Sequence, residues 1–244
     1  ELRAQSERLL GAIRNSELAP VERLPEPGLK DAGWFARIKH PVGLWDFFLS
    51  AYYGPGLYPV LKLERQGDPL TLIKENPDVF NLAGGFSTTW GSLELHGEVV
   101  YNRSVDERDE SYINGVVGFT YSNQSLARAL RLRRIDLSVE FAGEYVTSKQ
   151  GGPGYIATSR YRPIGRKDLF STLRIGVTGD LSVYAGLDET LWNDSRFYRV
   201  GSRYRVMAGL TLDVAMERFE GTFYSYYGHW SENDRIYTML TWTF

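Results

Sequence analysis

The sequence predicts an all-β fold, an antiparallel transmembrane β-barrel to which this chain contributes about 10 to 12 strands. Three observations predict it. Apolar and polar residues alternate with a period of two along segments of roughly nine to fourteen residues, a length typical of membrane-spanning strands. The connections between these segments alternate between short and long. Aromatic residues, which make up 14% of the chain, return near the segment ends.

The composition argues against several other classes. The 244 residues include 25 glycines and no cysteine, and the formal net charge is −2. No run of about eighteen apolar residues is present, so the sequence contains no transmembrane helix. The charge balance gives no reason to expect a nucleic acid partner. A soluble β-sandwich is the alternative within the all-β class, but its strands would be shorter, about five or six residues.

Residues 1–31 are expected to form a separate N-terminal segment of helix and loop. Apolar residues near Leu9 and Ile13 have helical spacing, and a proline-rich stretch follows from Pro20 without a period-two run. The predicted barrel then occupies residues 32–244.

Eleven strands are predicted in this second part. The segment 134–147 shows the pattern, because Val139 and Phe141 alternate with Ser138 and Glu140, so that one face suits lipid and the other suits water. The predicted strands are 32–40, 44–53, 79–90, 92–103, 111–123, 134–147, 167–178, 181–191, 197–212, 217–228 and 234–244.

The segment 197–212 is predicted as one continuous strand. In its second half the alternation runs without a break, which indicates a single face. That face consists of Tyr204, Val206, Ala208, Leu210 and Leu212.

Short and long connections alternate along the chain, as they do in membrane barrels, where one end has tight turns and the other has longer loops. The predicted short connections are 41–43, 90–92, 178–180 and the residues around Val214 to Glu217. The predicted long connections are 54–78, 104–110, 148–166 and 229–233.

Two connections complicate this pattern. The connection 124–133 lies on the short side yet has room for a helical turn. Within the first long connection, residues 57–63 alternate imperfectly and contain Pro59, which disfavours a strand interior. A missed strand would lie here.

The odd strand number needs an explanation, because bacterial single-chain barrels have an even number of strands. Eleven strands would leave the first and last strands starting at the same end of the barrel. Three explanations stay open: a complete barrel of twelve strands, a barrel of ten strands, or the C-terminal portion of a larger barrel.

The final strand resembles the C-terminal signal of bacterial outer-membrane β-barrels. Ile236, Leu240, Trp242 and Phe244 share one face and the last residue is aromatic, with Thr238 as the one departure. The resemblance implies a location in the bacterial outer membrane, in contact with its lipid and lipopolysaccharide.

A second, looser resemblance covers residues 28–122. It rests on the segments 45–56, 58–60 and 86–98, which are similar to the C-terminal half of a group of porin-like outer-membrane proteins of Gram-negative bacteria. Members of this group are longer. The resemblance implies transport across the outer membrane and carries over no catalytic residue.

If the apolar faces contact lipid, the opposite faces line a lumen with an acidic arc and a basic arc. Such charges are costly to bury dry, so the lumen should hold water or paired ions. The sequence therefore predicts either a channel for passive passage of small solutes or an interior filled by salt bridges. The predicted pore-lining residues are Glu94, His96, Glu98, Glu140 and Glu144 in the acidic arc and Arg174, Arg199, Arg203 and Arg205 in the basic arc.

Two alternatives belong to other classes. A non-conducting scaffold or adhesin would bind a partner through the connections 54–78 and 148–166. A lipid hydrolase would use His229 and Ser231, expected on the same side of a strand, which partly resemble the His-x-Ser-Asn motif of outer-membrane lipid hydrolases. Glu232 departs from that motif, because the family has Asn directly after Ser.

The sequence predicts a non-enzymatic protein without cofactor. No metal site is expected, because His40 and His96 lack a second His or Cys at ligand spacing. Besides lipid and a small solute, the expected partner is a second copy of the chain or another chain that completes the barrel.

Overall fold

The computed structural model describes residues 21–23, 28, 32–65, 70–150, 154–158, 165–223 and 225–243. Most of the predicted N-terminal segment and the terminal Phe244 therefore lie outside the described residues.

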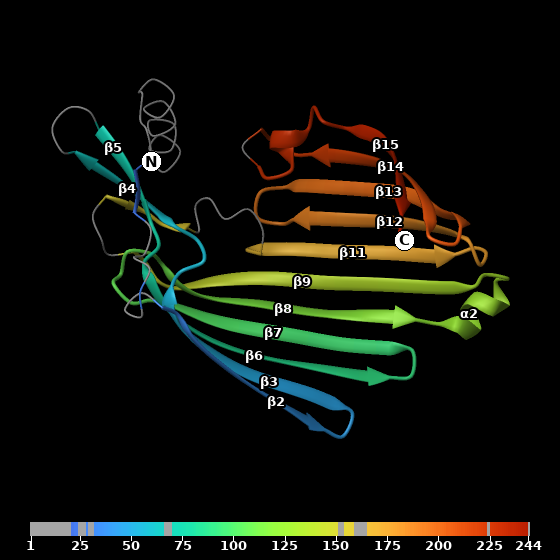
Figure 1. Cartoon of the computed structure of the whole chain (residues 1–244), viewed down its shortest axis with the longest axis horizontal. Helices are drawn as coiled ribbons and strands as arrows, with labels where there is room; N and C mark the ends of the chain where they lie inside the picture. Colours follow the sequence, from blue (N-terminus) through green and yellow to red (C-terminus); the bar gives the residue numbers. More distant parts are fainter. Residues whose placement is uncertain are drawn as a thin grey trace.

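A large antiparallel sheet of eleven strands forms most of the molecule, which confirms the all-β prediction (Figure 1). Strands that follow one another along the chain within this sheet are paired neighbours. Its strands are β2 (Trp34–Val42), β3 (Trp45–Pro55), β6 (Asp78–Trp90), β7 (Leu93–Ser104), β8 (Ser111–Ser122), β9 (Arg134–Ser148), β11 (Lys167–Gly176), β12 (Leu181–Thr190), β13 (Ser195–Met207), β14 (Leu210–Glu220) and β15 (Arg235–Trp242).

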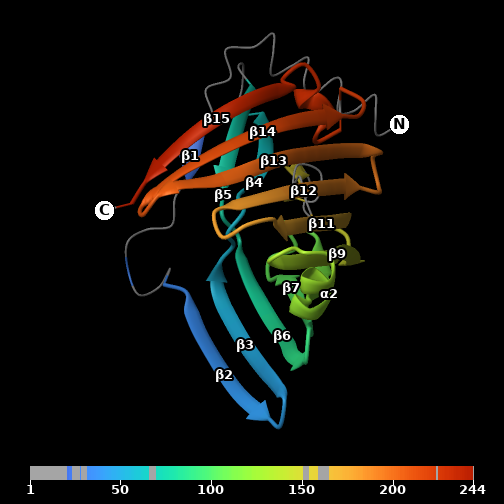
Figure 2. The same ribbon diagram turned by 90° about the vertical axis from the view of Figure 1, so that its right-hand side faces the viewer.

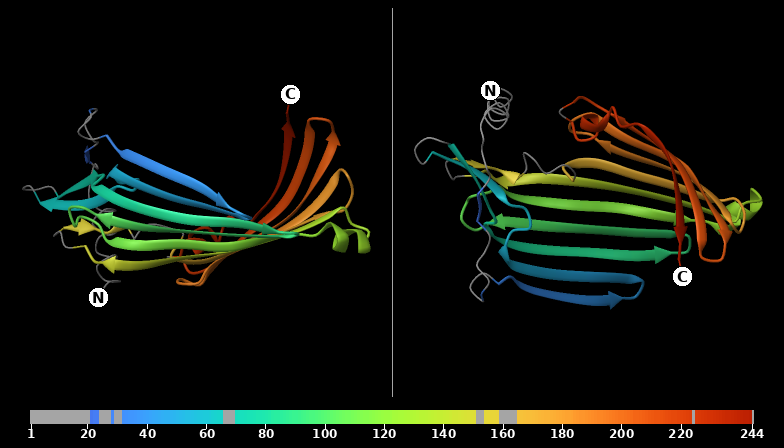
Figure 3. Two further views of the ribbon diagram at one scale, coloured as in Figure 1. Left: turned by 90° about the horizontal axis from the view of Figure 1, so that it is seen from below. Right: turned by 45° about the horizontal axis from the view of Figure 1, so that its top comes forward.

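The large sheet is strongly curved but does not close on itself. Among the described residues, β2 pairs only with β3, and β15 pairs only with β14. Figures 2 and 3 show these two edge strands apart, with the sheet forming an open trough between them. The described residues thus form an open, curved antiparallel sheet and do not by themselves form a complete barrel of ten or twelve strands, so the transmembrane barrel stays a prediction.

The two ends of the sheet differ, and we call them the short-turn end and the long-loop end. The short-turn end has tight connections at 43–44, 91–92, 177–180 and 208–209, together with helix α2 (Gln124–Ala129). The predicted helical turn in 124–133 is therefore confirmed, and Asn123 caps it by accepting a hydrogen bond from the Leu126 amide at 2.8 Å.

Both edge strands run in the same direction. β2 ends at the turn 43–44 and β15 ends beside Leu210, so each runs from the long-loop end to the short-turn end. This follows from the odd number of antiparallel strands between and including them.

The strand predicted at 217–228 overlaps β14 (Leu210–Glu220) only at residues 217–220, so its bounds are wrong, and the turn predicted around Val214 to Glu217 is wrong. The turn lies at Ala208 and Gly209, and β14 follows it directly. Gly209 has φ +79°, a left-handed conformation that glycine adopts without strain. A turn of two residues keeps the alternation of faces in phase, so two strands imitate one long strand in the sequence.

A second sheet of four short strands lies at the long-loop end (Figure 1). Its order is β1-β5-β4-β10. It consists of β1 (Val21–Arg23), β4 (Val60–Arg65), β5 (Leu70–Glu75) and β10 (Tyr155–Ile156). The strands within the connection 54–78 therefore exist but add nothing to the large sheet. β1 departs from the predicted helix and loop, since a three-residue strand is too short to show a period.

One face of the large sheet is apolar across all eleven strands, and we call it the apolar face. Residues paired directly across neighbouring strands share a face, so the register defines it. Every strand contributes a large apolar side chain that is 36% to 70% exposed. One such residue from each strand in turn is Ile38, Leu49, Leu82, Val99, Val117, Phe141, Leu173, Val183, Val200, Met216 and Leu240.

The buried apolar side chains lie elsewhere. Val60 and Ile73 of the second sheet and the neighbouring Ala157 are 0% to 2% exposed. We call the second sheet and the adjoining residues 104–111 and 154–158 the end cap. The described part of the chain contains no helix that is long and apolar enough to cross a membrane.

Candidate functional site

The face opposite the apolar face, which we call the polar face, carries all nine residues predicted to line a lumen. Register places them together: Arg174 pairs with Asp136 on one side and Tyr184 on the other, and the same face continues through Arg203 opposite Ser182. The acidic residues lie on β7 and β9, and the basic residues lie on β11 and β13. The structure thus brings the nine onto one surface, and their role as pore lining stays a prediction.

His96 and Glu140 form a pair across the intervening strand β8. His96 Nε2 lies 3.1 Å from Glu140 Oε1. Gly118 lies between them, and a Cβ atom there would be 2.6 Å from Glu140 Cγ and 2.9 Å from His96 Nε2. Only glycine leaves room for this contact, so the acidic arc contains at least one fixed pair.

The other predicted acidic residues differ in exposure. Glu94 and Glu98 are exposed on β7 and make no ion pair with a described residue. The Glu144 side chain is 3% exposed, and its carboxylate lies 3.6 Å from Arg166 Nε. Glu144 therefore belongs to a buried pair near the long-loop end and is not open to solvent.

Two of the four residues of the basic arc pair with carboxylates of β14, which the sequence did not predict. Arg203 Nη2 lies 2.8 Å from Asp213 Oδ2, and Tyr184 donates a hydrogen bond to Asp213 Oδ1 at 2.6 Å. Arg199 Nε lies 3.5 Å from Glu217, which also binds Arg235 at 2.6 Å. The predicted basic arc therefore contains carboxylates of β14 beside its arginines.

In these ion pairs the carboxylate is buried and the arginine is partly exposed. The side chains of Asp213 and Glu217 are 2% and 7% exposed, whereas those of Arg203 and Arg199 are 46% and 37% exposed. The carboxylates lie against the sheet and the guanidinium groups reach into the trough. What a solute on this surface would meet is therefore mainly arginine.

Two open hollows mark the polar face. The first, of about 610 Å³, lies at the short-turn end of β9 to β14 and includes Arg174, Arg203 and Arg205. The second, of about 620 Å³, lies between β2 and β9, where Arg37 and Lys39 line the same space as Glu98. Both hollows therefore contain positive and negative side chains, and the first has more arginines than carboxylates.

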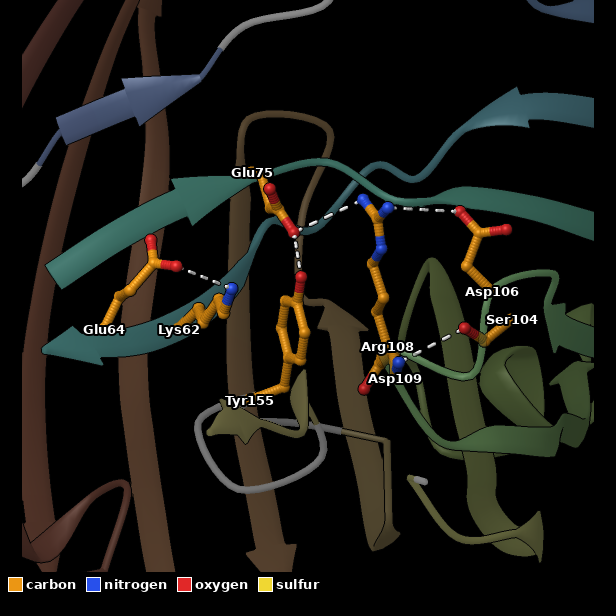
Figure 4. Close-up of polar contacts among 8 residues, drawn as sticks. All are labelled: Lys62, Glu64, Glu75, Ser104, Asp106, Arg108, Asp109 and Tyr155. Atoms are coloured by element: carbon orange, nitrogen blue, oxygen red, sulfur yellow. Dashed lines mark hydrogen bonds and ion pairs between the residues drawn. The ribbon is translucent and has the colours of Figure 1, made fainter. Parts of the chain in front are cut away.

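The end cap is held by a polar network (Figure 4). Glu75 Oε1 accepts a hydrogen bond from the Tyr155 hydroxyl at 2.7 Å and lies 3.4 Å from Arg108 Nη1. Asp109 accepts two hydrogen bonds from Thr158, one from the amide at 2.8 Å and one from the hydroxyl at 2.6 Å. Two connections far apart in the chain are thereby tied to the second sheet.

The residues of the predicted hydrolase motif do not lie on a strand. His229 is in the 3₁₀ turn η2 (Gly228–Trp230), and Ser231 ends that turn. The His229 ring contacts the rings of Phe223 and Trp230, with centroids 5.3 Å and 5.5 Å away. Among the described residues no hydrogen bond joins His229 to Ser231, so the expected side-by-side arrangement on a strand is wrong.

Tyr227 is a buried residue of this connection, and its ring stacks on Phe197 with centroids 5.7 Å apart. Burial, together with the nearby Asp188 carboxylate, raises the pKa of the Tyr227 hydroxyl. It therefore stays protonated and serves as a packing residue with a polar tip. In the described ranges, no group of three or more His, Asp or Glu side chains is arranged to hold a metal ion.

Comparison with known proteins finds no matching family model, no matching curated protein and no matching solved structure.

Proposed function

We propose that this chain forms part of the wall of a β-barrel channel in a bacterial outer membrane, with the polar face lining a water-filled lumen through which small solutes pass. The observation that carries the proposal is the exposed apolar face. It continues across eleven strands with no covering layer in the described part of the chain. Soluble monomers rarely expose apolar patches larger than a few hundred Å², whereas lipid would cover such a face.

The dimensions of the apolar face fit this proposal. On β3, Trp45 and Tyr53 lie on the apolar face near opposite ends of the strand, eight positions apart. At about 3.3 Å per residue the two positions are roughly 26 Å apart along the strand, which corresponds to about 20 Å along the membrane normal for a strand tilted by about 40°. A transmembrane barrel has an apolar band of about 25 Å bounded by aromatic girdles.

The open edges must be completed for the chain to span a membrane. Unpaired N–H and C=O groups cost several kcal/mol each in hydrocarbon, so only closed barrels are stable there. The missing strands would come from other segments of a longer protein or from a partner chain. A barrel of more than about eight strands also leaves interior space for water, which suits the exposed arginine side chains.

The test is ion conductance of the native protein in planar bilayers, combined with its intact mass. We expect steady conductance, and Arg203→Glu should shift the reversal potential toward cation selectivity because it reverses a charge on the polar face. The matched control is Arg218→Glu, since Arg218 lies on the opposite face of β14. Conductance with selectivity unchanged by Arg203→Glu would rule out this lining, and a native protein without conductance would rule out the channel.

A second candidate, a scaffold that binds a partner through the end cap, is favoured by one observation. The two connections that the sequence assigned to partner binding meet in the second sheet, where β10 pairs with β4. Leu57, next to this sheet, is 85% exposed, and its neighbour Tyr58 is 49% exposed. The scaffold would be supported if the wild-type protein does not conduct and a partner that co-purifies with it is lost from the Leu57→Ser variant. No geometry favours the hydrolase, and we expect Ser231→Ala to change no lipase activity.

A further inference from the structure

The hollow at the short-turn end of the polar face has an excess of positive charge. Two carboxylates, Asp136 and Asp180, line it. Against them stand five arginines from β9, β11, β13 and the residue before β9. These are Arg133, Arg134, Arg174, Arg203 and Arg205.

Three of these arginines are already paired. Arg134 Nε lies 2.6 Å from Asp136, and Arg205 Nε lies 3.1 Å from Asp180. Arg203 binds Asp213, which lies beneath the hollow. The carboxylates in and under the hollow are therefore occupied.

Arg133 and Arg174 make no ion pair with any described residue. Arg174 stands directly opposite Asp136 in the sheet register, but the Asp136 carboxylate binds Arg134 and also accepts a hydrogen bond from Ser122 at 2.5 Å. Arg174 is exposed to the open trough. Two guanidinium groups are thus free to bind a ligand in a surrounding that already repels cations.

We infer that this hollow binds a small oxyanion, a phosphate or carboxylate group, with Arg174 as its principal ligand. A guanidinium group presents a planar fork of donors that matches two oxygens of such a group. An anion would also relieve the repulsion among the arginines. Because the site needs only the geometry of this hollow, the inference goes beyond the proposed channel and does not depend on conduction.

The arginines continue from this hollow along the polar face. Arg174 and Arg203 also line a smaller hollow of about 220 Å³, together with Arg199. For an oxyanion bound at the short-turn end, the guanidinium group of Arg199 is therefore the next one along the polar face. If the chain conducts, this arrangement predicts a preference for anionic solutes.

The test is calorimetric titration of the native protein in neutral maltoside micelles with inorganic phosphate and, separately, with succinate. We expect saturable binding that weakens when sodium chloride is raised from about 0.01 M to about 0.15 M, since the Debye length falls from roughly 30 Å to 8 Å. Arg174→Gln should weaken binding by about tenfold or more. Arg174→Lys keeps the positive charge but loses the planar fork of donors, so its affinity for phosphate should lie between those of the wild type and Arg174→Gln.

Arg128→Gln is the matched control, because Arg128 lies in α2 at the same end but outside the hollow. A wild-type protein without saturable binding, or an Arg174→Gln variant that binds phosphate as tightly as wild type, would overturn the inference. The bound phosphate group could belong to a free solute or to a lipid headgroup, and glycerol phosphate and a short-chain phosphatidic acid distinguish these two sources. Equal affinity identifies a free solute, and much tighter binding of the lipid identifies a headgroup.

The outcomes of the two tests are independent. Oxyanion binding in micelles without conductance in bilayers would remove the channel and leave the site. Conductance in bilayers without oxyanion binding in micelles would support the channel and rule out the site.

Discussion

The end cap and the large sheet bury opposite kinds of surface. In the end cap, Val60 and Ile73 are almost fully buried, and charged groups such as Asp109 are buried with complete hydrogen bonds. In the large sheet, apolar residues such as Ile38 and Ile236 are at least 70% exposed, whereas Asp213 on the opposite face is 1% exposed. The end cap therefore has the burial pattern of a protein in water, and the large sheet has the inverse.

This difference indicates where the stability of each region originates. The end cap contains its own apolar contacts and buried hydrogen bonds, which stabilise it in water. In the described part of the chain, no apolar layer covers the large sheet, so its apolar face gains no stability in water from burial there. Three substitutions would break or sharpen this comparison.

The largest effect is expected for Val117→Arg on the apolar face. Val117 is 55% exposed in the middle of β8. In lipid vesicles the arginine should lower the free energy of unfolding by about 2–4 kcal/mol, because its charge would face hydrocarbon. In water an exposed substitution would change it by less than about 0.5 kcal/mol.

The matched control for Val117→Arg is Val116→Arg, which lies at the same depth on the polar face opposite Glu98. We expect at most a small change there, measured by urea unfolding in the same vesicles. Equal effects at the two positions would show that the apolar face does not contact lipid.

A smaller effect is expected for Asp109→Ala in the end cap. The substitution leaves the buried Thr158 amide and hydroxyl without their acceptor, which costs about 1–3 kcal/mol. Hydrogen exchange should become faster at the Thr158 amide and stay unchanged at Val117 of the large sheet. Asp109→Asn keeps one acceptor oxygen and should have less effect. Loss of protection in both regions together would mean that they do not unfold separately.

The smallest effect is expected for Tyr184→Phe on the polar face. It removes one hydrogen bond to Asp213, whose other oxygen keeps Arg203, so unfolding should become easier by about 1 kcal/mol. Tyr204→Phe, on the apolar face, should change nothing. If Tyr184→Phe also has no effect, the network around Asp213 does not stabilise the large sheet.

Much of the large sheet was predictable because the period of two persists over long strands. All eleven predicted segments overlap a strand of this sheet in the expected order, although 217–228 shares only residues 217–220 with β14. That boundary was misplaced because the two-residue turn at Gly209 kept Leu210 and Leu212 in phase with Tyr204. The end cap was harder to predict, because Pro59 interrupts the alternation before β4 and because β1 and β10 pair over long distances in the chain.

The faces of the candidate site were predictable, but its ion pairs were not. Alternation alone placed Arg199 and Arg203 on the polar face. Their partners Asp213 and Glu217 fell in the wrongly predicted turn, although their alternation with Val214 and Met216 could have identified a strand. An incomplete sheet was one of the explanations that the odd strand number left open, but no single strand records whether the first and last strands meet.

The common direction of β2 and β15 restricts how the sheet can be completed. Two copies in the same membrane orientation would meet at two seams, and at each seam β15 of one copy would run parallel to β2 of the other. Parallel pairs are slightly less stable per residue than antiparallel ones. An odd number of additional strands would make every seam antiparallel. A barrel closed by two copies of this sheet is therefore expected to be less stable at its seams than a single sheet extended by an odd number of additional strands.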